Sequence, residues 1–211
     1  DLMGRPIVIL DRQHHGKPRR RRPDSGAVAD LDGDGHIETH EWEANLTPLY
    51  IEAARDYLET RGIQVVVLEW GSYKARHAYA AAIAGAADGA PVAYCAAHLN
   101  AGGGQYAAIL HDPRSRGGRG LAVVLAKALE EEFDELSKAK AVPAGNGTRA
   151  FSTYAGIYAG PANLSGVCFE PCFMDTPEHR PLLTPGGLTR IGVALAKGCR
   201  TWIENRYTAD P

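Results

Sequence analysis

The sequence predicts a single α/β domain with a mostly parallel central sheet and helices on both faces of that sheet. Short apolar runs alternate along the chain with longer segments of helical periodicity, and strands that alternate with helices usually pair in parallel. The 211 residues contain no internal repeat and no linker. With 45% hydrophobic residues, a chain of this length can bury one substantial core.

The first half of the chain predicts two buried strands around one long helix. The run Pro6–Asp11 (PIVILD) is strongly apolar and is expected to be the first strand. After a polar loop, the segment 42–60 has helical periodicity and is closed by Arg61 and Gly62, because glycine is a common stop signal for helices. The run 63–68 (IQVVVL) is expected to be the second buried strand.

The second half continues the alternation of helices and strands. The Ala-rich segment 73–87 predicts a helix, and 91–98 (PVAYCAAH) predicts a strand that ends just before the glycines at 102–104. The remaining expected elements are strands at 105–111 and 167–173 and helices at 121–136 and 188–204. One domain that spans residues 1–211 accommodates all of them.

Composition excludes several classes of protein. A net charge of −2 argues against a dedicated nucleic-acid binder. No apolar run approaches the roughly 20 residues that a membrane helix needs, and Ile7–Leu10 is too short to be the core of a signal peptide. The cysteines are scattered without a CxxC pair, so we expect buried thiols, with one disulfide as the alternative. They are Cys95, Cys168, Cys172 and Cys199.

Residues 30–41 (DLDGDGHIETHE) fill every position of the calcium-binding pattern D-x-D-x-D-G-x5-E of EF-hand loops. Aspartates at alternate positions bring hard oxygen ligands to one centre, and Gly35 permits the sharp turn that the loop requires. The expected calcium ligands are the side chains of Asp30, Asp32, Asp34 and Glu41 and the backbone carbonyl of His36. The sequence therefore predicts a structural calcium site.

A second group of metal-binding side chains lies at the ends of predicted strands. His14 and His15 follow the first strand, His98 ends the third, and Glu170 lies within a later one. Ligand sites in such sheets form beyond the carboxyl ends of the strands, so we expect these side chains to converge. Two imidazoles and one carboxylate with an open fourth position are typical of catalytic zinc.

Four segments in order along the chain carry a resemblance to a known family. Residues 11–17 (DRQHHGK) correspond to a D-P-G-H-G-G-K stretch, 96–101 (AAHLNA) to S-x-H-A-N-A, and 170–179 (EPCFMDTPEH) to E-L-G-F-L-S-N-P-E-D. Residues 73–76 correspond to an L-x-x-R element. In these motifs, from Ile7 to the final helix, the chain resembles the zinc-dependent N-acetylmuramoyl-L-alanine amidases of the amidase-3 type.

This resemblance implies a hydrolase that cleaves the amide bond between N-acetylmuramic acid and L-alanine in peptidoglycan. His14, Glu43 and His98 would bind the zinc ion, which lowers the pKa of a bound water to near 7. Glu170 would be the catalytic residue that takes the proton of this water and passes it to the leaving amine. Asn100 would orient a ligand or bind the substrate.

The first histidine ligand has an alternative in its neighbour. Arg12, Gln13 and His15 depart from the residues that the family has in this stretch. Counting forward from Asp11 and back from the Gly-Lys pair at 16–17 both place His14 in the ligand position. We therefore favour His14 over His15.

The glutamate ligand is ambiguous between Glu41 and Glu43. If Glu43 is the zinc ligand, the helical period buries Tyr50, Ile51, Ala54 and Leu58 and leaves Glu52, Arg55 and Asp56 outside. If Glu41 is the ligand, the period buries Glu52 and Asp56, and burying unpaired charges is costly. Helix phase therefore assigns Glu43 to zinc and leaves Glu41 to close the calcium shell.

We expect a monomer whose partner is bacterial peptidoglycan and which acts on the cell wall. Without a signal peptide or a wall-binding module in the sequence, a phage endolysin or the catalytic domain of a secreted autolysin fits best. The alternatives are a zinc peptidase that acts on another peptidoglycan amide and a non-catalytic module that binds calcium or the wall.

Overall fold

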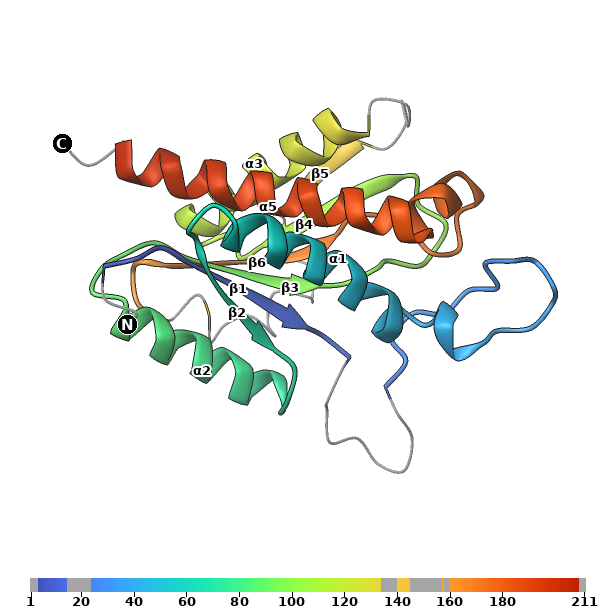
Figure 1. The fold of residues 1–211 in the computed structure, drawn as a ribbon, viewed down its shortest axis with the longest axis horizontal. Coiled ribbons are helices and arrows are strands. Elements are labelled where there is room, and N and C mark those ends of the chain that lie inside the picture. The colour runs from blue at the N-terminus through green and yellow to red at the C-terminus, as the bar shows by residue number, and fades with distance from the viewer. Residues whose placement is uncertain (1–3, 15–23, 134–139, 145–156, 158–159, 209–211) are drawn as a thin grey trace.

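The computed structural model describes residues 4–14, 24–133, 140–144, 157 and 160–208. In them a six-stranded sheet has the order β2-β1-β3-β6-β4-β5 (Figure 1). Its strands are β1 (Ile7–Arg12), β2 (Gln64–Leu68), β3 (Val92–Ala97), β4 (Tyr106–His111), β5 (Lys140–Ala144) and β6 (Leu164–Glu170). All neighbouring pairs are parallel except β4 with β6, which is antiparallel. The predicted, mostly parallel sheet is confirmed.

Helices cover both faces of the sheet, as predicted. The described α-helices are α1 (Glu43–Glu59), α2 (Tyr73–Ala86), α3 (Arg116–Glu132) and α5 (Pro185–Thr208), with 3-10 helices η1 (Thr39–Glu41) and η3 (Pro177–Leu183). In Figure 1, α1, α3 and α5 lie on one face and α2 lies on the other. The α/β fold in one domain therefore agrees with the sequence prediction.

Successive side chains of β1 point to opposite faces of the sheet, and the hydrophobic core accordingly has two layers. Val8 and Leu10 pack with the helices α1, α3 and α5, whereas Ile7 and Ile9 pack on the side of α2. All four side chains are fully buried. A strand covered on both faces must be apolar at every position, which is why the first run lacks the usual polar alternation.

The termini of several elements differ from the prediction. Helix α3 begins at Arg116, five residues before its predicted start, and the Ser115 hydroxyl caps it by accepting from the Gly118 N–H at 2.9 Å. Glycines within its first turns obscured this start, because glycine disfavours helix interiors. Helix α5 is longer than predicted at both ends, spanning Pro185–Thr208.

Two strands also differ from their predicted positions. The later strand was expected at 167–173, but β6 covers Leu164–Glu170 and ends where Pro171 follows. Strand β5 was not predicted at all. It lies at the edge of the sheet and includes Pro143, a residue that edge strands tolerate because one of their sides needs no hydrogen-bond donor.

The four cysteines are buried thiols in the described structure, which confirms the first of the two alternatives. None of the described helices combines the length and the apolar character that a membrane span requires.

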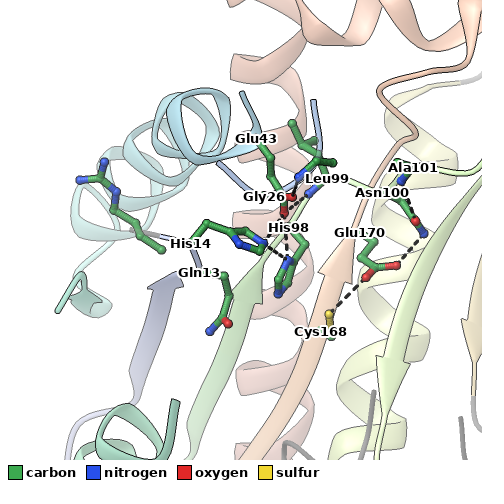
Figure 2. Close-up of polar contacts among 12 residues, drawn as sticks. Gln13, His14, Gly26, Glu43, His98, Leu99, Asn100, Ala101, Cys168 and Glu170 are labelled. Carbon is green, nitrogen blue, oxygen red and sulfur yellow. Dashed lines mark hydrogen bonds and ion pairs between the residues drawn. The ribbon is translucent and has the colours of Figure 1, made fainter. Parts of the chain in front are cut away.

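The parallel strands bring distant residues together at one edge of the sheet. Strands β1, β3 and β6 run in the same direction, so their carboxyl ends lie side by side. His14 follows β1, His98 follows β3, and Glu170 is the last residue of β6. The first residue of α1, Glu43, reaches the same edge (Figure 2).

Candidate metal centre

Two imidazoles and one carboxylate converge at this edge of the sheet. Figure 2 shows His14, His98 and Glu43 pointing toward one another from three different elements. His14 Nε2 lies 3.2 Å from His98 Nδ1 and 3.3 Å from Glu43 Oε1. His98 Nδ1 lies 2.9 Å from Glu43 Oε1. The three donor atoms thus form a compact triangle that leaves one side open.

Glu43 is held in place by backbone hydrogen bonds at the start of α1. Its Oε1 accepts from the Leu99 N–H at 2.9 Å, and its Oε2 accepts from the Ala27 N–H at 2.7 Å. Burial favours the neutral carboxyl, but hydrogen bonds and charges from His14 and His98 outweigh it and lower the pKa of Glu43 to about 2. The buried carboxylate is therefore ionised and ready to bind a cation.

His14 lies on a strained backbone that faces the loop at residues 24–27. Its φ of 25° falls in the left-handed region, which non-glycine residues rarely adopt. Its Nδ1 lies 3.2 Å from the Asp24 carboxylate, which leaves Nε2 for a metal. A Cβ atom at Gly26 would lie 2.4 Å from Glu43 Oε2 and 2.8 Å from His14 Cδ2, so only glycine fits there.

His98 is positioned through its backbone, at the end of β3. Its N–H donates to the Phe169 carbonyl at 3.0 Å, and its own carbonyl accepts from the Tyr50 hydroxyl at 3.0 Å. Tyr50 is fully buried on α1, so the helix that begins with Glu43 also anchors the loop that carries His98. The two imidazole rings meet edge to face, with centroids 5.0 Å apart.

The arrangement fits a tetrahedral zinc ion. Zinc binds imidazole nitrogens and carboxylate oxygens at roughly 2.0–2.2 Å, which places ligand atoms about 3.3 Å from one another. The observed separations of 2.9–3.3 Å between donor atoms agree with this spacing. The donor set of two imidazoles and one carboxylate is the one expected of a catalytic rather than a structural zinc site.

Glu170 lies next to this group on β6. Ala97 pairs with Phe169, so the residues that follow, His98 and Glu170, lie on neighbouring strands (Figure 2). Asn100 donates through Nδ2 to Glu170 Oε2 at 2.6 Å. Burial raises the pKa of the Glu170 carboxyl, although the nearby His98 charge and polar contacts oppose the shift. A buried carboxyl beside a metal site is a typical general base.

Comparison with solved structures shows which proteins share this architecture. AmiC2 of Nostoc punctiforme, an N-acetylmuramoyl-L-alanine amidase, matches with a TM-score of 0.65 and 17% identity, over 94% of this chain and 97% of its own. The catalytic domain of CwlV from Bacillus (Paenibacillus) polymyxa, also such an amidase, matches with a TM-score of 0.65 and 14% identity, over 94% and 98%. The chain has the amidase fold.

A further match is to a protein whose chain is much longer than this one. Cwp6 from Clostridium difficile has a TM-score of 0.67 and 20% identity over 93% of this chain, which spans 29% of the Cwp6 chain. Neither a protein-family model nor a curated protein matches the sequence. The likeness to the amidases therefore rests on structure, and at these identities it establishes the fold.

A buried network of polar side chains fixes the end of β1, just before His14. Asp11 and Arg76 form an ion pair with both side chains almost fully buried. The Arg76 guanidinium also donates to the carbonyls of Arg12 at 2.6 Å and of Glu69 at 2.9 Å. Tyr94 donates its hydroxyl to the other Asp11 oxygen. Arg76, noted in the sequence only as part of a motif, thus holds the backbone that leads to His14.

The buried face of α1 is the one predicted on the assumption that Glu43, and not Glu41, faces the metal centre. Tyr50, Ile51, Ala54 and Leu58 are fully buried, as expected if Glu43 faces the sheet. Glu43 lies with the two histidines, whereas Glu41 points into a different acidic cluster. His15, the alternative first ligand, lies outside the described residues.

The predicted calcium loop, residues 30–41, projects from the periphery of the molecule (Figure 1). One oxygen from each of Asp30, Asp32 and Glu41 lies within 4.8 Å of the other two. Asp32 and Asp34 form a second such group with Glu38. The loop departs from a complete EF-hand, because residues 24–29 before it are not helical.

Backbone amides shape the loop around its acidic side chains. Asp30 accepts from the N–H groups of Gly33 at 2.6 Å and of Gly35 at 2.9 Å, and both glycines have positive φ. Asp34 accepts from the His36 N–H at 2.8 Å. Glu41 is fully buried and accepts from the Leu31 N–H at 2.5 Å. The carboxylates are therefore gathered on one side of the turn.

Several residues that complete the metal centre were not recognised in the sequence. Asp24, Gly26 and Tyr50 each contact a proposed ligand from far away along the chain. Of these three, only Tyr50 could be singled out from the sequence, because helical periodicity placed it on the buried face of a helix. Asn100, expected to orient a ligand or bind the substrate, contacts Glu170 instead of the three donors.

Proposed function

We propose that this chain is a zinc-dependent hydrolase that acts on the bacterial cell wall and cleaves the amide between N-acetylmuramic acid and L-alanine. The observation that carries the proposal is the triangle of His14, Glu43 and His98 beside a buried Glu170, on the fold of proteins named as N-acetylmuramoyl-L-alanine amidases. A fold shared at low identity does not name a substrate, so the triangle supplies the chemical argument.

The residues divide into those that hold the metal and those that move a proton. A zinc ion bound by the three side chains would polarise the scissile carbonyl and make a water molecule more acidic. Glu170 accepts the proton of the attacking water and later donates it to the leaving amine nitrogen. Asn100 holds Glu170 Oε2 by its 2.6 Å hydrogen bond, and Oε1, which the Cys168 thiol contacts at 3.6 Å, would accept the proton of the water.

Two other functions are compatible with the fold. A zinc peptidase would use the same residues on a different peptidoglycan amide. A non-catalytic wall-binding module would need neither the three metal-binding side chains nor Glu170. The presence of His14, Glu43, His98 and Glu170 together therefore argues against such a module. Glu170 supports this argument, because a buried carboxyl with a raised pKa is typical of a catalytic site.

Digestion of purified peptidoglycan sacculi by the zinc-loaded protein tests the proposed bond. The proposal predicts new amino ends on L-alanine, no new reducing ends on the glycan, and loss of the reaction when a chelator removes the metal. New amino ends on another residue of the stem peptide would support the peptidase. Absence of all new ends would support the binding module.

We also propose that residues 30–41 bind one calcium ion that stabilises the entry to α1. A complete match to the twelve-residue pattern supports this proposal, together with the fully buried Glu41 carboxylate opposite Asp30 and Asp32. Calcium that binds only the folded loop raises the melting temperature by mass action. Because η1 leads directly into α1, the calcium site would brace the helix that begins with Glu43.

Alanine variants of the two glutamates separate the two metals. Glu41→Ala should abolish stabilisation by calcium and retain one zinc per chain. Glu43→Ala should lose zinc and nearly all activity, while calcium still raises the melting temperature. Metal analysis and melting curves with and without calcium check both variants. If Glu41→Ala is the variant that loses zinc, the two assignments must be exchanged.

A further inference from the structure

A cavity of about 690 Å³ lies at the end of the sheet opposite the metal centre. It is formed where the N-terminus of α3, the start of β6 and the last turns of α5 meet. Strand β6 begins with Leu164 at this cavity and ends with Glu170 at the metal centre, so the length of the strand separates the two sites. The proposed hydrolysis uses none of the residues that line the cavity.

The lining of the cavity is strongly positive. Arg114, Arg116 and Arg206 line it, and no aspartate or glutamate does. Arg114 is already paired with the Asp112 carboxylate at 2.7 Å. Within the described residues, neither Arg116 nor Arg206 forms an ion pair. Two uncompensated guanidinium groups around one cavity favour an anionic ligand.

Other hydrogen-bond donors converge on the same space. The Ser165 side chain is 1% exposed, lines the cavity, and lies 3.5 Å from Arg206 Nη2, at the limit of a hydrogen bond. The first turn of α3 adds the positive end of a helix of 17 residues. A Cβ at Gly117 would lie 2.2 Å from Ser165 Oγ and 2.5 Å from Arg206 Nη2, so glycine is what lets these polar groups approach the helix backbone.

Apolar side chains form part of the remaining lining. Val124, Pro161, Leu164 and Trp202 line the cavity beside the arginines. The Arg206 guanidinium lies over the Trp202 ring, 4.9 Å from its centroid, which orients the charge. A cavity of this volume, lined by both arginines and apolar side chains, is too large for a bare anion. Its mixed lining fits an anionic group joined to a carbon skeleton.

We propose that this cavity binds a phosphate group carried by a sugar or a polyol. Guanidinium groups and a helix N-terminus match a tetrahedral dianion with several acceptor oxygens, because each oxygen can take more than one N–H. The phosphate would lie between Arg116, Arg206 and Ser165, and the carbon skeleton would lie along Leu164 and Trp202. This site is independent of the proposed hydrolase activity.

Isothermal titration of the intact chain with glycerol 3-phosphate, inorganic phosphate and glycerol tests the proposal. Glycerol 3-phosphate should bind more tightly than inorganic phosphate, and glycerol should not bind. Arg116→Ala should weaken binding by about tenfold or more, as expected for the loss of a charge-assisted contact. Arg119→Ala is the matched control, because this exposed arginine on the same helix does not line the cavity and its removal should leave the affinity within about twofold.

Gly117→Ala provides a second test that does not remove a charge. The added methyl group would occupy the space where Ser165 and Arg206 meet, so binding should be lost, while helix propensity favours alanine and protects the fold. Hydrolysis of sacculi by this variant should be unchanged. Equal binding of inorganic phosphate and glycerol 3-phosphate would overturn the role of the carbon skeleton. No binding, or equal weakening by Arg119→Ala, would overturn the site itself.

Discussion

Glu170 shows how the surroundings of one residue decide its chemistry. Burial raises the pKa of its carboxyl, while Asn100 and Cys168 contact its two oxygens. It is not one of the three converging donors, so its removal should leave the metal in place. In the proposed mechanism Glu170 is therefore the proton carrier and Glu43 the ligand, although both are carboxylates at the same edge of the sheet.

Glu170→Gln keeps the shape of the side chain and removes its basicity. We expect activity on sacculi to fall by about 10²–10⁴-fold, because a general base typically contributes that much, with zinc still near one per chain. Measured turnover and metal content check both parts. Glu178→Gln, at an exposed glutamate of η3, is the control and should keep normal activity. Loss of zinc from the Glu170 variant would make this residue a ligand.

Asn100→Ala should change the pH dependence of the reaction. The general base must be ionised, so activity rises with pH as Glu170 loses its proton. The hydrogen bond from Asn100 favours the ionised form and lowers the pKa of Glu170, opposing the effect of burial. Without it, the pKa rises further and the acid limb of the pH–rate profile should move to higher pH. An unchanged profile would mean that Asn100 does not position Glu170.

The sequence predicted the convergence of the proposed ligands better than it predicted the residues that support them. His14, Glu43 and His98 stand in short motifs and at the ends of predicted elements, so their convergence could be inferred from a parallel sheet. Asp24 and Gly26 lie in a loop without a regular pattern, and they contact His14 and Glu43 only after folding. Such contacts between distant segments leave no local signature in one sequence.

At the scale of elements, helices α1 and α5 approach each other closely. Gly192 of α5 faces the backbone of α1, where a Cβ would lie 2.3 Å from the Tyr50 carbonyl oxygen and 2.7 Å from Ala53 Cβ. The neighbouring atoms belong to backbone and a short side chain, so they can move only if the helices separate. The same α1 segment carries the Tyr50 hydroxyl that supports His98.

Gly192→Ala should therefore destabilise the protein by about 1–3 kcal/mol, since overpacking outweighs the better helix propensity of alanine. Denaturant unfolding measures the change. Gly85→Ala is the matched control on α2, where a Cβ would meet no atom within 4 Å, and it should raise stability by about 0.5–1 kcal/mol. Equal effects at the two glycines would contradict the close approach of α1 and α5.

Glu132 joins the end of α3 to α5. Its carboxylate accepts from Lys197 Nζ at 3.0 Å and from Arg190 Nε at 3.2 Å, and Arg190 also donates to the Glu132 carbonyl. Partial burial favours the neutral carboxyl, but the two cations outweigh it, so the pKa of Glu132 lies below its ordinary value. A carboxyl with a lowered pKa stabilises the fold above its unfolded pKa and loses that effect as the pH falls.

Glu132→Gln should thus lower the free energy of unfolding by about 1 kcal/mol at pH 7. The difference from the parent chain should shrink as the pH falls from about 5 to 3, because protonation then removes the same charge from the parent. Urea titrations at several pH values measure it. The exposed Glu130 on α3 serves as control, and its glutamine variant should change stability by less than about 0.5 kcal/mol throughout.

Helices and strands with a strong hydrophobic periodicity were predicted well from the sequence. Elements that depend on tertiary contacts were predicted poorly. Helix α1 follows its predicted 42–60 closely because one apolar face runs its whole length. The first five residues of α3 include three glycines, yet they are helical because Ser115 caps the helix and Gly117 fits against Ser165. Strand β5 forms at the sheet edge beside β4, a position that its five residues do not encode locally.

For the whole molecule, the direction of the strands explains where the metal centre lies. Because β1, β3 and β6 are parallel, they end at one edge, and each delivers one residue to it. The antiparallel β4 begins at that same edge and ends near the cavity with the uncompensated arginines. In our proposals the two ends of the sheet would therefore bind ions of opposite charge, a cation at the carboxyl ends of the strands and an anion at the start of α3.

X-ray data collected at the zinc absorption edge, from crystals of the zinc-loaded chain, test the central claim most directly. The account predicts one strong anomalous peak roughly 2.0–2.2 Å from His14 Nε2, His98 Nδ1 and Glu43 Oε1. A fourth position should face the open side of the triangle, next to Glu170. A peak coordinated by His15 or Glu41, or no peak among these three side chains, would contradict the assignment of this site.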